Sequence, residues 1–150
     1  MSRSRVLSAV PAKNPGPPGS CIFCDIIARR AKGYILYEDE EAVAFLDLFP
    51  FTRGHLLVVP RHHVDRLTDF AEREYSAYLR AIANVCRRVD RLSKHYNVAA
   101  NQGSLAGQIV FHLHFHVIPR YGEDNPFRTT PRERLREEDA LALVEVLSRP

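Results

Sequence analysis

Apolar and polar positions alternate with two different periods along this chain, and the two periods separate strands from helices. Short runs rich in β-branched and aromatic residues predict strands, which we place at 34–39, 41–48, 55–60, 96–101 and 109–119. Apolar residues three and four positions apart predict helices, which we place at 21–33, 67–93 and 137–148. The strands follow one another in pairs and not as repeated strand–helix–strand units. The expected fold class is therefore α+β, an antiparallel sheet of about five strands with one long helix and one or two short ones.

Local signals define three of these elements more closely. Ser20 is the expected N-cap of the first helix, and Gly33 is the residue expected to end it. The run 55–60 is almost entirely apolar, which is typical of a strand buried on both faces. The acidic segment 38–41 joins the first two strands, so we expect a hairpin there.

The composition is that of an ordinary globular domain. The chain has 150 residues, of which 26% are charged, and this length suffices for one domain with its own core. The net charge of +3 is small and the basic residues are interleaved with acidic ones, so we expect no nucleic-acid partner. No apolar run approaches the length of a membrane span, so we expect no membrane partner either.

The first twenty residues differ from the rest of the chain. They are rich in Ser, Pro and Gly, and no acidic residue precedes Asp25. We expect a disordered N-terminal tail over 1–20 and a single domain over 21–150. The apolar piece VLSAV is too short for a signal-peptide core, and the Pro/Gly run would disrupt the amphipathic helix of an organelle transit peptide. These features favour a cytoplasmic protein.

The three cysteines are best explained without disulfides. Their number is odd and there is no secretory signal, so a disulfide framework is not expected. Cys86 falls in a helical pattern and fits a small buried apolar side chain. Cys21 and Cys24 form a CxxC pair with the spacing of zinc ligands. The alternatives are two unliganded thiols and a redox pair, which would favour a strand–helix–strand context that this sequence lacks.

Three histidines lie two positions apart in the segment FHLHFHVIPR, residues 111–120. Side chains alternate between the faces of a strand, so His112, His114 and His116 share one face and the apolar residues between them point to the core. Histidine serves as a base, a nucleophile or a metal ligand near neutral pH, so the row favours function over an ordinary polar face. Residues two apart on a strand are separated by roughly 6.6 Å, whereas zinc–nitrogen bonds are about 2 Å long. The outer pair cannot easily share one ion, and at least one histidine has another task.

The loop before this strand suits a phosphate. The segment NQGSLAGQ, residues 101–108, offers two glycine-permitted turns, exposed backbone N–H groups and three side-chain amides. An ordinary connecting loop is the alternative. A neutral imidazole, with an unperturbed pKa of about 6.5, can attack phosphorus without a separate base, so loop and histidines together suggest chemistry at a phosphorus centre.

The run 112–118 follows the pattern His-φ-His-φ-His-φ-φ, where φ is apolar. With the segments CIFCDII, YILYEDEEAVAFLDLFPFTRGHLLVVPRHHV and AGQIVFHLHFHVIPRYG, it resembles the histidine triad (HIT) family of nucleotide hydrolases and transferases, and in particular its bacterial zinc-binding members. The resemblance covers about residues 21–122. It implies the HIT fold and hydrolysis of a nucleotide through a nucleotidyl-histidine intermediate.

Site residues follow from this resemblance position by position. It implies that His114 is the nucleophile that attacks the α-phosphorus, that His116 supports the phosphate and the leaving group, and that His55 is a further active-site histidine. The resemblance also implies substrate-binding residues. Asp47 would be the carboxylate that binds the ribose, and Asn101 and Gln108 would form hydrogen bonds to the phosphate. The apolar pocket for the base would consist of Ile22, Phe23, Ile26, Phe45 and Leu48. Without the resemblance, Asp47 fits a turn, His55 a loop, and the apolar five a core.

The resemblance also implies a complete ligand set for zinc. The partners of Cys21 and Cys24 would be His63 and His112, which makes a closed Cys₂His₂ site of the structural kind. With His112 assigned to the metal, His114 and His116 are free for phosphorus.

The expected substrates are purine nucleoside 5′-phosphoramidates or nucleotidyl adducts, and the expected product is a nucleoside monophosphate. The alternatives are a diadenosine polyphosphate hydrolase and a nucleotide- and zinc-binding module with little turnover. Many phosphoramidase members carry Ser where this chain has Ile109, which removes a hydroxyl contact to the phosphate or leaving group. The resemblance further implies a homodimer that pairs through the long helix and a sheet strand.

Overall fold

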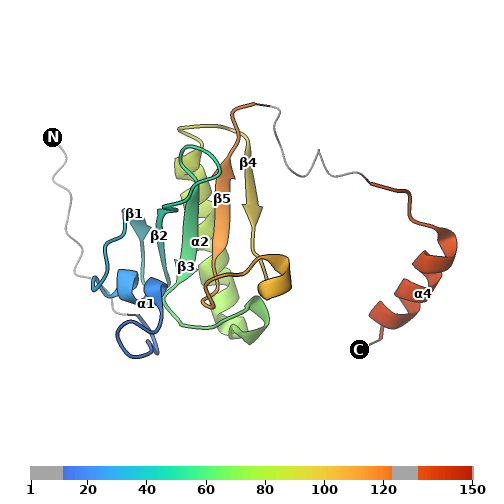
Figure 1. The fold of residues 1–150 in the computed structure, drawn as a ribbon, viewed down its shortest axis with the longest axis horizontal. Helices are drawn as coiled ribbons and strands as arrows, with labels where there is room; N and C mark the ends of the chain where they lie inside the picture. Colours follow the sequence, from blue (N-terminus) through green and yellow to red (C-terminus); the bar gives the residue numbers. More distant parts are fainter. Residues whose placement is uncertain (1–11, 123–131, 150) are drawn as a thin grey trace.

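The computed structural model describes residues 12–122 and 132–149 and contains one five-stranded antiparallel sheet. The spatial order is β1-β2-β3-β5-β4 (Figure 1), with strands at Ile35–Glu38 (β1), Ala42–Leu46 (β2), Leu56–Pro60 (β3), Tyr96–Ala99 (β4) and Phe115–Pro119 (β5). The helices are Ile22–Ile27 (α1), Glu72–Val89 (α2) and Glu137–Leu147 (α4), with single 3₁₀ turns at Leu67–Asp69 (η1) and Ser104–Ala106 (η2). The expected α+β class, antiparallel sheet and first hairpin are confirmed.

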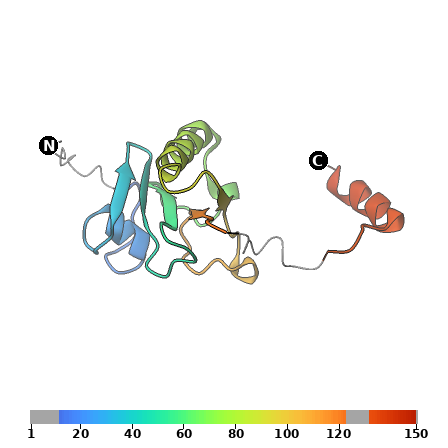
Figure 2. The same ribbon diagram turned by 90° about the horizontal axis from the view of Figure 1, so that it is seen from above.

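The two faces of the central strands are covered by different helices. Ala42, Ala44, Leu56 and Val58 face α2 and belong to the larger core cluster, whereas the residues between them face α1 in a second cluster. Figure 2 shows α1 and α2 on opposite sides of the sheet. All five residues of β3 are buried, as the continuous apolar run predicted.

Three predicted elements are longer than those observed. The expected helix 67–93 is divided, because Phe70 is extended (ψ 137°) and buries its ring in the core, so that η1 precedes α2. The helix expected over 21–33 ends at Ile27, because Arg29 adopts a left-handed conformation (φ 63°). The strand expected over 109–119 begins only at Phe115, and the preceding residues bend. Within it, Leu113 and Val117 are buried in the core, as the alternation predicted.

The N-cap of α1 also differs from the prediction. The sulfur of Cys21 accepts a hydrogen bond from the Cys24 N–H and so replaces Ser20 as the cap. Ser20 instead donates its hydroxyl to the Pro17 carbonyl at 2.6 Å.

The predicted tail, 1–20, falls partly outside the described residues. From residue 12 onward the chain lies against the domain: Ala12 is buried, and Lys13 forms a parallel bridge with His62. At the other end of the chain, α4 matches the predicted helix 137–148, and none of its residues is buried. No helix in the described ranges is both long enough and apolar enough to cross a membrane.

Candidate active site and metal centre

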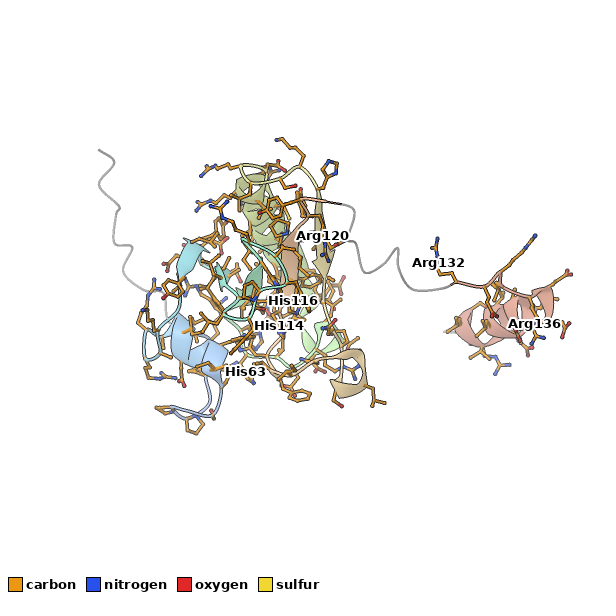
Figure 3. All side chains as sticks on the ribbon, turned by 45° about the horizontal axis from the view of Figure 1, so that its top comes forward. His63, His114, His116, Arg120, Arg132 and Arg136 are labelled. Carbon is orange, nitrogen blue, oxygen red and sulfur yellow. The ribbon has the colours of Figure 1, made fainter. Side chains whose placement is uncertain are left out.

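The catalytic candidates meet at the centre of the sheet. His116 lies on β5, opposite Leu57 of β3, and His114 immediately precedes β5. Figure 3 shows the two side chains close together over the sheet, and their ring centroids are 5.1 Å apart. His55 directly precedes β3, and its carbonyl accepts the backbone N–H of Asp47, which follows β2. Strand register thus gathers four side chains from three separate segments.

The position of the proton on His114 follows from its hydrogen bond. Its Nδ1 lies 2.7 Å from the carbonyl oxygen of His112, and because a carbonyl can only accept, Nδ1 carries the proton. The other ring nitrogen, Nε2, therefore keeps its lone pair. Burial lowers the pKa of His114 below its ordinary value, which keeps the ring neutral near pH 7. A neutral ring with an available lone pair is a nucleophile.

Hydrogen bonds that run from Phe51 through His55 place the proton of His116 on Nε2, whereas the proton of His114 is on Nδ1. The backbone N–H of Phe51 donates to His55 Nδ1 at 3.0 Å, so neutral His55 carries its proton on Nε2. That Nε2 lies 2.9 Å from His116 Nδ1, to which it donates. His116 must then carry its own proton on Nε2. Burial, followed by the nearby His114 and His55, lowers the pKa of His116 to about 4, so the ring is a neutral N–H donor.

Asp47 both ends its strand and faces the histidines. Its Oδ1 accepts the backbone N–H of Phe49 at 2.8 Å, the geometry of a turn residue. Its Oδ2 lies 3.5 Å from Nε2 of His55. The two interpretations of Asp47 from the sequence are therefore compatible, because one oxygen forms the turn and the other faces the site.

A pocket of about 450 Å³ opens beside these groups, within the usual size of a small-molecule site. Its wall includes His114, His116, Asp47 and Asn101, together with the five apolar residues expected to hold a base: Ile22, Phe23, Ile26, Phe45 and Leu48. Phe23 sets its ring edge-on to His114, with centroids 5.1 Å apart. The sequence-predicted binding residues are thus brought together, with one exception.

Gln108 is that exception, because it does not contribute to the pocket wall. Its side chain is buried, its Nε2 donates to the Asp65 and Val110 carbonyls, and its Oε1 accepts from the Gly103 N–H. The amide therefore holds the loop in place from behind. His55 is likewise buried (1% exposed) behind His116, outside the pocket wall.

Cys21, Cys24, His63 and His112 form a second cluster, and each offers one donor atom within 4.8 Å of the others. His112 Nδ1 lies 3.5 Å from each cysteine sulfur and 3.1 Å from His63 Nδ1, which in turn lies 3.2 Å from the Cys24 sulfur. Zinc bonds of about 2.0–2.3 Å place tetrahedral donor atoms roughly 3.3 to 3.8 Å apart. These separations fit four corners around one ion.

The protonation of the donors also fits a cation. His112 Nε2 lies 2.8 Å from the Pro60 carbonyl and must donate, so Nδ1 presents its lone pair to the cluster. Burial lowers the pKa of His112 to about 4, which keeps it neutral. Burial and the adjacent Cys21 raise the pKa of the Cys24 thiol to about 12. A divalent cation would stabilise the thiolates that such an environment otherwise opposes.

Asp47, His55 and His116 also lie within reach of a common ion. Their hydrogen bonds fit a different role: His55 Nδ1 accepts from Phe51, and its Nε2–H donates to His116. No donor lone pair of His55 is left for a metal in this arrangement. We therefore assign these three residues to a proton-positioning network.

Several pocket residues were not predicted from the sequence. Phe49 and Phe51, at 90% and 77% exposure, line the mouth of the pocket from the loop FPFTRG. Phe51 also stacks on His55, with ring centroids 5.4 Å apart. The sequence did contain a signal for these two residues, because they are aromatic and lie in a loop that follows the candidate site residue Asp47.

Comparisons with known proteins agree with this geometry. The family model described as "HIT domain" matches residues 28–123. Protein hit of Bacillus subtilis (strain 168) is 40% identical over 110 residues, which cover 72% of this chain and 76% of that protein. Adenosine 5′-monophosphoramidase hnt1 of Schizosaccharomyces pombe is 34% identical over 105 residues, 70% of this chain and 77% of that one. The crystal structure of a histidine triad nucleotide-binding protein from Candida albicans superposes with a TM-score of 0.73 at 29% identity and covers 86% of this chain and 95% of that chain.

Proposed function

Because this chain belongs to the HIT domain family, we propose that it is a nucleotide hydrolase that acts at the α-phosphorus of purine nucleoside 5′-phosphoramidates or related nucleotidyl adducts. The observation that carries the proposal is the opposite protonation of two neighbouring histidines. His114 offers a lone pair at Nε2, and His116 offers a proton at Nε2, on the wall of one pocket. A nucleophile beside a proton donor is what cleavage of a phosphorus–nitrogen bond requires.

The reaction has two balanced steps. In the first, His114 Nε2 forms a bond to the α-phosphorus and the phosphorus–nitrogen bond of the substrate breaks, while the departing amine accepts a hydrogen bond from His116 Nε2–H and takes a proton from a water molecule. In the second, the hydroxide left by that water attacks the same phosphorus and the bond to His114 breaks. The products are a nucleoside monophosphate and a free amine.

The pocket supplies the binding groups for this substrate. We assign the base to the recess formed by Ile22, Phe23, Ile26, Phe45 and Leu48, and the ribose hydroxyls to Asp47, whose Oδ2 faces the site. Asn101 lines the pocket at the loop that we assign to the phosphate. Backbone N–H groups and Asn101 then bind the phosphate, and Gln108 keeps the loop in shape.

We further propose that Cys21, Cys24, His63 and His112 bind one structural zinc ion. Bound there, the ion would tie the start of α1 to β3 and to the segment that enters β5, and it has no open position for substrate. Reduced thiols belong to a reducing compartment, which supports a cytoplasmic location. Two copies would pair through α2 and the edge strand β4, where Leu79 and Val98 are 66% and 43% exposed.

Two other functions share parts of this site. A diadenosine polyphosphate hydrolase would use the same nucleophile with a phosphate leaving group that needs no proton at neutral pH. The described wall of the pocket contains one basic side chain besides its histidines, Lys32, and this favours a leaving group without a chain of phosphates. A binding module would hold the nucleotide without turnover.

Purified protein tested for nucleoside monophosphate release separates these functions. We expect hydrolysis of adenosine 5′-phosphoramidate in preference to diadenosine tetraphosphate, and a nucleotidyl group on His114 in mass spectra of intermediates that are quenched rapidly and kept at alkaline pH. His114→Ala should abolish turnover, whereas His95→Ala is the matched control, because His95 is an exposed histidine outside the pocket. Nucleotide binding without turnover of either substrate by wild type would support the binding module and contradict our proposal.

A further inference from the structure

Residues 12–20, here called the N-terminal strap, lie across the metal cluster although they precede both the family match at 28–123 and the first ligand. The strap begins with two backbone hydrogen bonds. The Lys13 N–H donates to the Arg61 carbonyl at 2.9 Å, and the N–H of His63 donates to the Lys13 carbonyl at 3.1 Å. One of the four metal ligands is thus held by the strap through its own backbone.

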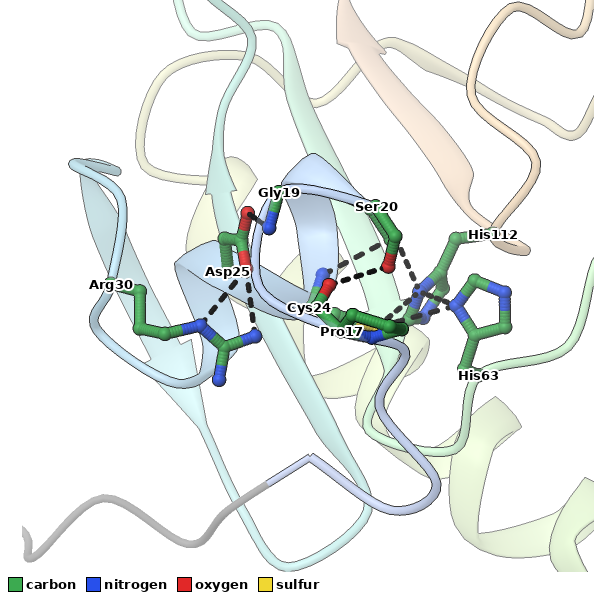
Figure 4. A network of polar contacts seen from close by, with 9 residues as sticks. Pro17, Gly19, Ser20, Cys24, Asp25, Arg30, His63 and His112 are labelled. Atoms are coloured by element: carbon green, nitrogen blue, oxygen red, sulfur yellow. Dashed lines mark hydrogen bonds and ion pairs between the residues drawn. The ribbon is translucent and has the colours of Figure 1, made fainter.

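The far end of the strap is fixed beside α1. The Gly19 N–H donates to Asp25 Oδ2 at 3.0 Å, and the other oxygen of Asp25 accepts two hydrogen bonds from the Arg30 guanidinium, at 2.7 and 3.0 Å. Asp25 is buried (8% exposed), which makes this contact firmer than a surface ion pair. Figure 4 shows the strap turning between Pro17 and Ser20 close to Cys24, with His63 and His112 drawn to the right of this turn.

The middle of the strap closes on itself in a tight turn. Ser20 donates both its hydroxyl, at 2.6 Å, and its backbone N–H, at 3.0 Å, to the Pro17 carbonyl. The space beside this turn is narrow, because a Cβ added at Gly16 would lie 2.4 Å from the Ser20 hydroxyl.

Burial of the ligands shows what the strap protects. Cys24 and His112 are 1% and 0% exposed and Cys21 is 8% exposed, whereas the His63 side chain is 28% exposed. Ala12, at the start of the strap, packs in the same apolar cluster as the two cysteines. His63 is therefore the ligand that solvent can reach, and it is the one whose backbone the strap restrains.

We propose that the N-terminal strap governs how fast the metal leaves the Cys₂His₂ cluster, by restraining His63 through the backbone of Lys13. This inference rests on the zinc site of the proposed function. Release from a closed tetrahedron requires one ligand to move out and water or a chelator to enter. The strap opposes the first event at the exposed ligand, because it holds the His63 backbone.

A matched pair of variants tests the strap. Lys13→Pro removes the N–H that binds the Arg61 carbonyl, and Lys13→Ala keeps it. Zinc-loaded protein is mixed with an excess of a chromogenic chelator, and the release rate is followed under conditions where far-ultraviolet circular dichroism shows each variant folded.

We expect Lys13→Pro to release zinc about 10-fold faster or more, in line with other residues that support metal ligands from behind, and Lys13→Ala to stay near the wild-type rate. A Lys13→Pro variant that releases zinc at the wild-type rate would overturn the inference. Wild type that binds no zinc would instead refute the metal site itself.

Wild-type protein provides a test that does not depend on a variant folding. Hydrogen exchange of the zinc-loaded chain should protect the amides of Lys13 and His63, since each donates to a backbone carbonyl. Rapid exchange of both amides in folded, zinc-loaded protein would contradict the strap as strongly as the mutants could.

Discussion

Replacing His55 with phenylalanine should slow cleavage of substrates whose leaving group is an amine. His55 is 1% exposed, and its ring occupies a closed space that a phenyl ring of similar size can fill. The change removes the Nε2–H that lies 2.9 Å from His116 Nδ1. Without that donor, His116 can carry its proton on either nitrogen, and the fraction with Nε2–H facing the pocket falls.

The expected size of the effect follows from the lost hydrogen bond. A hydrogen bond between neutral groups contributes about 1 kcal/mol net, which corresponds to about a fivefold change in rate. We therefore expect about a fivefold fall in kcat on adenosine 5′-phosphoramidate, with KM little changed, because His55 lies outside the pocket wall. A phosphate leaving group needs no proton at neutral pH, so kcat on diadenosine tetraphosphate should change much less.

Steady-state kinetics on the two substrates, with nucleoside monophosphate measured by chromatography, gives the comparison. Long-range ¹H–¹⁵N spectra of the histidine rings supply an independent observation: wild-type His116 should be protonated at Nε2, and His55→Phe should show a mixture of both forms. Because the pKa of His116 is about 4, the wild-type signal should remain that of a neutral ring at pH about 5.5, where an unperturbed histidine is about 90% charged.

Equal losses on both substrates would refute the reasoning, because they would show that His55 supports binding or folding and not the hydrogen bond from His116 to the departing amine. A wild-type His116 that carries its proton on Nδ1 would also refute the reasoning, because His116 would then donate to His55 Nε2 instead of accepting from it.

Three further predictions concern stability. Phe23→Ala should lower the free energy of unfolding by about 3–5 kcal/mol and raise KM, because the ring is buried and contacts both Phe45 and His114; urea unfolding and kinetics measure the two effects, and an unchanged KM would remove Phe23 from the base pocket. Gly54→Ala should destabilise the fold by about 1–3 kcal/mol, since φ is +86° and the new Cβ would lie 2.5 Å from Leu92 Cδ1; an unchanged Tm would contradict this. The pKa of His116 in the folded protein, about 4, lies below its unfolded value of 6.5, so the unfolded chain binds more protons below pH 6.5. The free energy of unfolding should therefore fall as pH drops from about 6.5 to about 4. His116→Phe should make that fall shallower when urea unfolding is measured at each pH, and an identical slope would argue against the shift.

Hydrophobic periodicity predicted the five strands of the described residues and the order of the helices, because the central strands and α2 bury regular apolar faces. It failed at element ends, where single contacts decide. Phe70 interrupts the predicted long helix because its ring is buried in the core, with centroids 5.4 Å from Tyr78. Cys21 replaces Ser20 as a cap because its sulfur already points inward to the metal cluster. Neither event is visible in local propensity.

The sequence predicted which residues gather around the candidate site better than it predicted what each of them contacts. The family resemblance implied that His114, His116 and Asp47 share one site, and the structure places all three on the wall of one pocket. Gln108 and His55 stand behind the pocket because their hydrogen bonds are taken by backbone and by other histidines. The N-terminal strap was missed for a related reason: its Pro/Gly composition indicated disorder, whereas its contacts are made by backbone groups that composition does not report.

Neighbouring rings in the alternating row of histidines carry their protons on opposite nitrogens, since His112 and His116 are protonated at Nε2 and His114 at Nδ1. His112 donates from Nε2 to Pro60 and directs Nδ1 to the metal cluster, while its carbonyl accepts the Nδ1–H of His114. The same residue therefore contacts the metal cluster with its side chain and fixes the nucleophile with its backbone. A shift of the His112 backbone of a few tenths of an ångström would weaken the 2.7 Å hydrogen bond that holds the proton on His114 Nδ1. It would thereby allow the other tautomer of His114, in which the lone pair is on Nδ1 and is turned away from phosphorus. The proposed ligand and the proposed nucleophile are two positions apart on the chain, and we propose that this closeness lets a metal site with no open coordination position influence the chemical step.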